Sequence, residues 1–204
     1  MTETQLLFGG KVRCADGPAG RLHRAVVAPE DGALTHLAVK PDGLQGGRLV
    51  PAALIAYAQG EEIRLGCMIA EFVRLEAAEE TAEQHTASWP YAEDEQPGRF
   101  PSGFEGVERD TGYGNRTVIR DRIPDGGVEV HRGEIVSATD GEAGRLLGLV
   151  IDLPDTHVTH LLLSRGRLFG GRTRIAVPIA NVTNFGDGIQ LNLTTQHLRT
   201  LPAT

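Results

Sequence analysis

The chain of 204 residues has little cysteine, few aromatic residues and no long apolar run. Its two cysteines, Cys14 and Cys67, are too few for a disulfide framework or a four-thiolate zinc site. No stretch approaches the roughly 20 apolar residues that a membrane-spanning helix needs. The first residues also lack the basic region and apolar stretch of a secretion signal. We therefore expect a cytoplasmic protein with no membrane segment and no bound cofactor.

Positive charge is also scarce. Lys and Arg together number 20 against 27 Asp and Glu, so the formal net charge is -7. Binding to nucleic acid depends on a surplus of Lys and Arg that neutralises phosphates. The composition therefore disfavours nucleic acid as the main partner.

Glycine is abundant, with 26 residues, whereas aromatic residues make up only 5% of the chain. This balance favours many short strands joined by tight turns over a large helical core. An all-β fold is therefore expected.

The most informative pattern is an internal repeat. Identical segments recur 124 positions apart (140 minus 16) without a gap, after which the second copy carries an insertion of three residues. The repeat predicts a first domain over 1–75, a linker over 76–128 and a second domain over 129–204. The matching pairs are Asp16–Gly17 with Asp140–Gly141, Gly20–Leu22 with Gly144–Leu146, Thr35–Leu37 with Thr159–Leu161, Gly46–Arg48 with Gly170–Arg172, and Ile63–Leu65 with Ile189–Leu191.

Each copy has the pattern of about six strands in about 60 residues, and such a short unit hides its strand edges most readily by closing into a small barrel. A short helix is expected at the end of each copy, with Thr194 and Thr195 capping residues 197–201 in the second. The strands expected in the second copy are 133–138, 144–153, 158–164, 175–177, 182–185 and 189–193.

The order of these features resembles the PRC-barrel domain over 9–75 and 129–202. The resemblance rests on a Gly-rich turn, a Gly-Arg-Leu strand, a Thr-His-Leu strand, the Leu168–Gly171 hairpin and the Val177–Ile179 turn. This domain is shared by the cytoplasmic part of the photosynthetic reaction-centre H subunit and the C-terminal half of the ribosome maturation factor RimM. The resemblance implies two tandem PRC-type barrels and a role in docking onto larger assemblies.

The linker is acidic and contains no Lys or Arg from 76 to 95. Its Glu and Ala residues favour a helix that continues from Ile69 to about Gln84, and Pro90 should end it. The rest of the linker is then a solvated spacer, or its aromatic residues, including Trp89 and Tyr91, hold it against a barrel or present it to a partner.

No catalytic motif is present: neither a G-x-S-x-G elbow, a phosphate loop, an H-E-x-x-H pair nor a Rossmann glycine fingerprint occurs. The protein is therefore not expected to be an enzyme. His36 and His160 occupy equivalent positions, but strand alternation places them opposite the core-facing Leu37 and Leu161. We interpret both as outer-face histidines and expect no metal site.

Two sets of residues are candidates for interaction. Arg165, Arg167, Arg172 and Arg174 surround Phe169 in a hairpin whose counterpart, 40–45, is nearly neutral. This hairpin is either an ordinary solvated turn or a docking site for an anionic segment such as the chain's own acidic linker.

The second candidate set lies on one strand. If Leu146 and Val150 face the barrel core, then Leu147, Leu149 and Ile151 form an apolar outer wall, with His160 on the neighbouring strand. The first copy has His23, Ala25 and Val27 in the places of those three residues. The wall should therefore be covered by the first barrel or by a second copy of the chain in a homodimer.

The favoured function is a non-enzymatic protein-interaction or assembly module with an unidentified protein partner. An RNA- or ribosome-associated maturation-type factor and a small-ligand or metal-binding regulator are the alternatives. Cys14 and Cys67 align with Ala138 and Leu193, so both are predicted to be buried, neighbouring thiols without chemistry.

Overall fold

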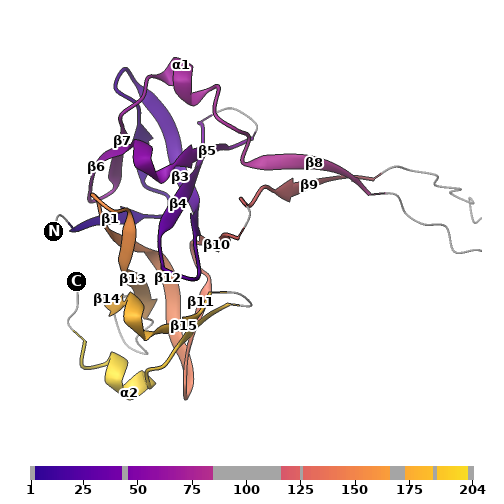
Figure 1. Ribbon diagram of the computed structural model, residues 1–204. Coiled ribbons are helices and arrows are strands. Elements are labelled where there is room, and N and C mark those ends of the chain that lie inside the picture. Colours follow the sequence, from indigo (N-terminus) through magenta and orange to yellow (C-terminus); the bar gives the residue numbers. More distant parts are fainter. Residues whose placement is uncertain are drawn as a thin grey trace, which may run out of the picture. The chain divides into compact units, whose positions relative to one another are not determined.

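A computed structural model describes residues 3–42, 46–84, 116–124, 126–165, 173–185 and 188–201 (Figure 1). The first half contains β1 (Glu3–Leu7), β2 (Lys11–Arg13), β3 (Pro18–Val27), β4 (Leu34–Lys40), β5 (Arg48–Pro51), the 3-10 helix η1 (Ala52–Leu54), β6 (Ile55–Gln59), β7 (Glu62–Leu65) and α1 (Ile69–Phe72). The second contains β10 (Val128–His131), β11 (Ile135–Ala138), β12 (Gly141–Asp152), β13 (His157–Arg165), β14 (Thr173–Pro178), η2 (Ile179–Asn181), β15 (Val182–Asn184), β16 (Ile189–Leu191) and α2 (Thr195–Leu198).

The halves form two seven-stranded sheets with the same strand order. One sheet follows β5-β4-β3-β2-β7-β6 and the other β14-β13-β12-β11-β16-β15. The β2–β7 and β11–β16 pairs are parallel, and the other pairs are antiparallel. The expected all-β class and the short helix at the end of each copy are confirmed. The expected closed barrels are not found, because no pairing within the described ranges joins the two ends of either path.

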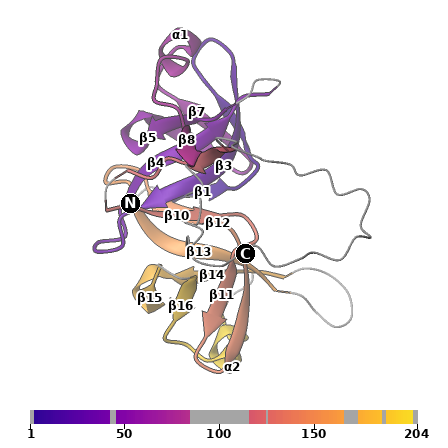
Figure 2. The same ribbon diagram turned by 90° about the vertical axis from the view of Figure 1, so that its right-hand side faces the viewer.

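The seventh strand of each sheet comes from the other half of the chain. Strand β1 pairs antiparallel with β12, and β10 pairs antiparallel with β3. Leu6 lies opposite Leu149, and Val130 lies opposite Ala25. These pairs are related by the same shift of 124 (130 minus 6 and 149 minus 25), so the exchange is reciprocal. Figures 1 and 2 show both exchanged strands between the indigo and orange parts of the chain.

The loops after β3 and β12 repeat this symmetry. The Leu34 amide donates to the Thr156 carbonyl at 2.9 Å, and the Val158 amide donates to the Gly32 carbonyl at 3.0 Å. Subtracting 124 from Thr156 and Val158 gives 32 and 34, so the two bonds are equivalent. A local twofold relation therefore connects the two halves, although the sequence differs at many positions.

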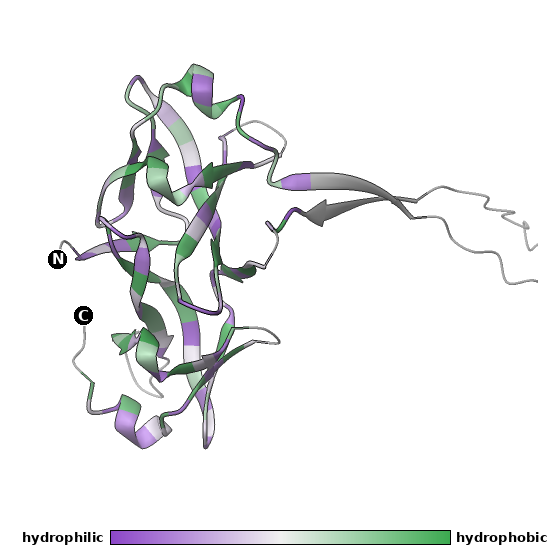
Figure 3. Ribbon diagram, in the orientation of Figure 1, coloured by the Kyte–Doolittle hydropathy of each residue, from purple (hydrophilic) through white to green (hydrophobic). Residues whose placement is uncertain are grey.

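The exchanged strands join the two halves around one hydrophobic core. A single cluster of buried side chains includes Leu6, Ala25 and Leu37 together with Leu149 and Leu161. Figure 3 shows apolar residues, in green, along the strands of both halves. Residues 1–79 and 121–204 accordingly form one compact unit. Buried apolar surface is the main stabilising term of a domain, so the halves are expected to unfold together.

A buried ion pair also crosses between the halves. Arg24 on β3 is 2% exposed, and its Nε lies 3.6 Å from Oε1 of Glu129 on β10. The Arg24 guanidinium also donates to the Ala78 carbonyl. Gly148 occupies the equivalent place in the second half, where a Cβ would lie 2.2 Å from the Leu6 carbonyl oxygen. The close approach of β1 therefore leaves no room for a side chain at Gly148.

The face of β12 that meets the core differs from the expectation. Strand pairing shifts between Leu146 and Gly148, so the alternation slips by one residue. Leu149 and Ile151 consequently join Leu146 in the core, whereas Val150 lies outside that cluster. The prediction that Val150 shares the core face of Leu146 is wrong for this reason.

The predicted helix from Ile69 to Gln84 is also wrong. Helix α1 ends at Phe72, and residues Glu79–Gln84 form strand β8, which pairs with β9 (Arg116–Asp121) in the second compact unit, 80–120. The Leu49 amide donates to the Glu76 carbonyl at 2.9 Å, and the Ala78 amide donates to the Gly47 carbonyl at 3.0 Å. Pairing with the edge of β5 therefore outweighs the helix propensity of Glu and Ala.

The prediction for the two cysteines is confirmed in its structural part. Cys14 and Cys67 are 5% and 6% exposed, and their Sγ atoms lie 3.9 Å apart. They follow the parallel strands β2 and β7, which explains their proximity. Burial, and then the hydrogen bond with Cys67, raises the pKa of Cys14 to about 12.

Candidate functional site

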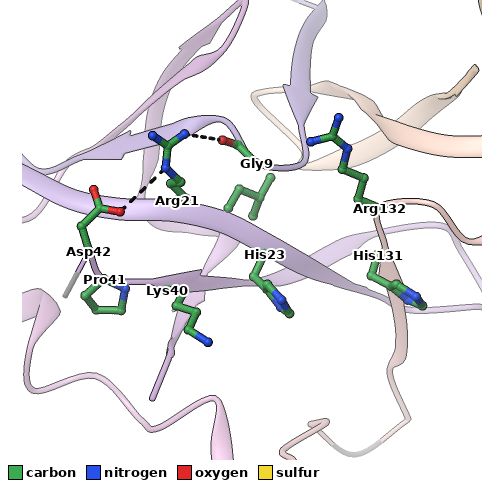
Figure 4. Close-up of a pocket in the computed structure, with 9 residues that line it drawn as sticks. Gly9, Arg21, His23, Lys40, Pro41, Asp42, His131 and Arg132 are labelled. Carbon is green, nitrogen blue, oxygen red and sulfur yellow. Dashed lines mark hydrogen bonds and ion pairs between the residues drawn. The ribbon is translucent and has the colours of Figure 1, made fainter. Parts of the chain in front are cut away.

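A basic groove of about 490 Å³ lies beside the outer part of β3 and β4 and the end of β10 (Figure 4). We call it the basic groove and define it by Arg21, His23, Lys40, His131 and Arg132. The first three residues belong to the first half, and the last two belong to the second. The strand exchange therefore supplies part of its lining.

Strand geometry explains how these side chains come together. Arg21 and His23 alternate with the buried Leu22 on β3, so both are exposed on the opposite face. Lys40 is the register partner of Arg21 on β4. His131 ends β10 opposite Arg24 of β3. Figure 4 shows the Lys40, His23 and His131 side chains extending in one direction and the Arg21 and Arg132 side chains extending in the other.

The groove contains one carboxylate, Asp42, which neutralises little of this charge. Arg21 Nε lies 3.7 Å from Asp42 Oδ1, and the two side chains are 55% and 74% exposed. Exposed pairs of this kind contribute only about 0–1 kcal/mol. Arg21 also donates from Nη1 to the Gly9 carbonyl at 3.2 Å. Among the described residues, Lys40 and Arg132 have no carboxylate within ion-pair distance, so their charges are available to a ligand.

Two neighbouring residues shape the side of the groove formed by the second half. His131 Nδ1 lies 3.6 Å from Glu134 Oε2, and the His131 amide donates to the same oxygen at 3.2 Å. Burial raises the pKa of the Glu134 carboxyl above its ordinary value. Gly9 has φ +85°, and a Cβ there would lie 3.3 Å from Arg132 Nη1. Glycine at this turn therefore leaves space for the guanidinium.

The equivalent surface of the second half provides an internal comparison. A hollow of about 460 Å³ lies there, lined in part by Arg145, Leu147 and Ser164, and also by Glu142 and by Arg132, which therefore borders both hollows. By the shift of 124, these residues replace Arg21, His23 and Lys40, while Leu7 and Phe8 stand in place of His131 and Arg132. Arg145 keeps the structural bond, donating to the Gly133 carbonyl at 3.1 Å. The arginine and its bond are thus kept in both halves, whereas the second half adopts the same strand order without counterparts of the other four ionisable groups.

The residues predicted from the hairpin lie elsewhere. Arg165 ends β13 and is half-buried, whereas Arg174 on β14 is exposed. The register pairs Ser164 with Arg174 and Arg165 with Thr173, so Arg165 and Arg174 lie on adjacent strands but, by strand alternation, on opposite faces of the sheet. Arg167, Phe169 and Arg172 lie outside the described residues.

The apolar set predicted on β12 is mostly internal. Leu149 and Ile151 are fully buried in the shared core, while Leu147 is half-buried. His160 is half-buried, and its Nδ1 lies 3.0 Å from Thr159 Oγ1 and 3.7 Å from Glu3 Oε1. Glu3 belongs to the exchanged strand β1, so His160 contacts the other half of the chain. Leu149 and Ile151 are therefore covered by the chain itself.

Sequence reasoning missed His131 and Arg132 because it placed them in a different domain from Lys40. A usable signal was present in the differences between the copies: His23 against Leu147, Lys40 against Ser164 and His131 against Leu7. Each of these differences exchanges an ionisable residue for a neutral one.

Comparison with models of known protein families finds no match, and comparison with characterised proteins finds none. Within the described ranges, no group of three or more His, Cys, Asp or Glu side chains could hold a metal ion. In the same part of the chain, every helix is too short or too polar to cross a membrane.

Proposed function

We propose that this chain is a non-enzymatic interaction or assembly module, built of two PRC-type domains, whose basic groove binds an acidic segment of a protein partner. The observation that carries the proposal is the gathering of Arg21, His23, Lys40, His131 and Arg132 around one hollow. Carboxylates form charge-assisted hydrogen bonds with such groups, and these bonds are stronger than neutral ones.

The charge of the whole chain favours a short ligand over a long polyanion. The formal net charge is -7, so the groove is a local positive site on a negative protein. A long nucleic acid is held by many Lys and Arg contacts along its phosphates, whereas a short acidic segment needs only the groove. RNA would bind the same groove through its phosphate oxygens. We therefore favour a protein segment over RNA because of the charge of the whole chain.

The equivalent half supplies the variants for a test. Lys40→Ser and His23→Leu introduce the residues that the second half already carries at these positions, so both should preserve the fold. A matched control is Arg199→Ser, which removes one exposed positive charge after α2. Melting curves should show that all three variants remain folded.

The measurement is fluorescence anisotropy with a labelled Glu-rich peptide, its Gln-containing counterpart and a single-stranded RNA of equal length. The proposal predicts that the Glu peptide binds best and that the combined Lys40→Ser and His23→Leu change weakens it about tenfold, or ~1.4 kcal/mol. Arg199→Ser should leave its affinity unchanged. Preferential binding of RNA with a steep salt dependence would support the RNA-associated alternative instead. Equal affinity for the Glu and Gln peptides would refute the proposal.

A further inference from the structure

A second hollow lies next to the basic groove. It has a volume of about 290 Å³ and shares Pro41 and Asp42 with the groove. Its remaining lining includes Ile69, Phe72 and Val73 around α1, Pro18, Ala19 and Gly20 on β3, and Gly46 and Arg48 near the start of β5. The volume is just below the range of roughly 300–1,000 Å³ that is typical of small-molecule sites. It is better suited to one apolar side chain than to a cofactor.

Helix α1 exposes more apolar surface than the fold requires. Met68 and Val73, which flank the helix, are 52% and 50% exposed. Phe72 is the residue that anchors the helix, and it is 2% exposed. Single exposed apolar side chains are common on proteins. Here, however, Val73 lines a hollow together with two further apolar residues of the same segment.

Comparison with helix α2 shows which apolar residues of α1 have apolar counterparts in the second half. After the insertion, the two copies align with a shift of 126 (198 minus 72), so Leu198 replaces Phe72 and is also fully buried. At the equivalents of Met68, Ile69 and Val73, the second half has Thr194, Thr195 and Arg199. The buried anchor is therefore kept in both helices, whereas the apolar character of the other positions is confined to α1.

The two features that distinguish the first half from the second thus adjoin each other. One is the positive charge of the basic groove, and the other is the hollow beside α1 with its apolar residues Ile69, Phe72 and Val73. Asp42 lies at their boundary and is held near Arg21. Neither feature is needed for the fold, because the second half adopts the same strand order without them.

We propose that the two hollows form one composite docking site for an extended protein segment that carries acidic residues beside a large aliphatic or aromatic side chain. The acidic residues bind in the basic groove, and the apolar side chain enters the hollow beside Ile69, Phe72 and Val73. This inference rests on the proposed function, which supplies the acidic part of the partner. Charge complementarity selects the segment, and the apolar side chain adds affinity by leaving water.

The test uses three labelled peptides that differ at few positions. The first has a Glu-rich stretch and one Leu, the second has Ala in place of Leu, and the third keeps Leu but has Gln in place of Glu. The inference predicts that the Glu-Leu peptide binds the intact protein about tenfold more tightly than the Glu-Ala peptide, as expected when a few methylene groups are buried. That preference should persist at high salt, whereas the contribution of Glu should fall.

Protein variants assign the preference to the hollow. Val73→Thr changes an exposed side chain to a polar one of similar shape, and Ile69→Thr introduces the residue that α2 carries. Each should reduce the ratio of the Glu-Leu affinity to the Glu-Ala affinity toward one. The affinity for the Glu-Ala peptide should stay unchanged. If Ile69→Thr lowers the melting temperature, Val73→Thr alone decides the result, because its side chain is exposed.

The outcomes separate this inference from the proposed function. If both Glu peptides bind with equal affinity and Lys40→Ser weakens both, the composite site is refuted while the basic groove remains supported. If the Leu preference exists but survives Val73→Thr and Ile69→Thr, the apolar side chain binds elsewhere and the inference is again refuted. If neither Glu peptide binds, the proposed function is refuted, and the composite site is refuted with it.

Discussion

Leu6, from the first strand of the chain, lies directly opposite Leu149 in the middle of β12. Both side chains are buried, at 1% and 0% exposure, in the core that the two halves share. The equivalent pair, Val130 and Ala25, performs the same role on the other sheet. The two copies are therefore held together by exchanged strands and by common burial.

The Leu6–Leu149 relationship predicts energetic coupling between the halves. Leu6→Ala and Leu149→Ala should each lower the free energy of unfolding by about 2–5 kcal/mol, because each leaves a cavity in the shared core. Their effects should not add, with a coupling of about 0.5–3 kcal/mol between these facing residues. Urea denaturation measures all three variants. Leu147→Ala, at a half-buried position, is the control and should cost less. Strictly additive, small effects would contradict the shared core.

The buried cysteine pair predicts slow thiol chemistry. Cys14 and Cys67 should react with a thiol reagent only when the protein opens, because both are buried and the raised pKa of Cys14 leaves little thiolate at neutral pH. An exposed cysteine introduced by Arg64→Cys should react rapidly in the same sample. Equally rapid labelling of Cys14 and Cys67 in the native protein would disprove their burial.

The same thiol predicts a pH dependence of stability. The pKa of Cys14 rises from an ordinary 9.0 to about 12 in the folded chain. Below pH 9 the thiol is protonated in both states, and above it the unfolded state loses the proton first. The contribution of Cys14 is therefore complete below about pH 9 and is lost as the pH rises toward 12. The stability difference between the native chain and Cys14→Ala, measured by urea denaturation, should shift against the native chain over this range. A difference that stays constant from pH 8 to 11 would contradict the raised pKa.

The arginine hairpin remains a separate prediction. We expect Arg165 and Arg174 to attract acidic ligands through long-range charge, since they lie on adjacent strands and Arg174 is exposed. Replacing Arg165, Arg167, Arg172 and Arg174 with Ser should weaken binding of the Glu-rich peptide moderately and flatten its salt dependence. The melting temperature should change little for Arg174→Ser alone, because an exposed charge contributes little to stability. If the quadruple variant binds the peptide as tightly as the native chain at every salt concentration, the hairpin is only a turn.

Much of the local structure could be predicted from the sequence because it depends on local pattern. The strands of the second copy, the capping of α2 by Thr194 and the neighbouring cysteines all follow from alternation, turn residues and the repeat. The exchange of β1 and β10 could not be predicted, since either copy of this strand fits either sheet. The choice depends on pairing between residues more than 100 positions apart, such as Leu6 and Leu149.

The candidate site was harder to predict than the strands for related reasons. A single slip in pairing near Leu147 moved Leu149 and Ile151 from the expected outer wall into the core. The basic groove combines Lys40 with Arg132, and only the strand exchange brings these two residues to one hollow. The hairpin arginines were conspicuous in the sequence because they are close together along the chain, whereas the groove residues are not.

The most direct test of the account is the affinity of the Glu-rich peptide for Arg132→Ser, measured beside Lys40→Ser and the double variant. Arg132 comes from the second half and Lys40 from the first, and they line one groove only because β10 pairs with β3. Each single change should weaken binding several-fold, the double change should weaken it further, and all three variants should melt like the native chain. If Arg132→Ser binds the peptide as tightly as the native chain while Lys40→Ser does not, the groove does not draw on both halves and the account is contradicted.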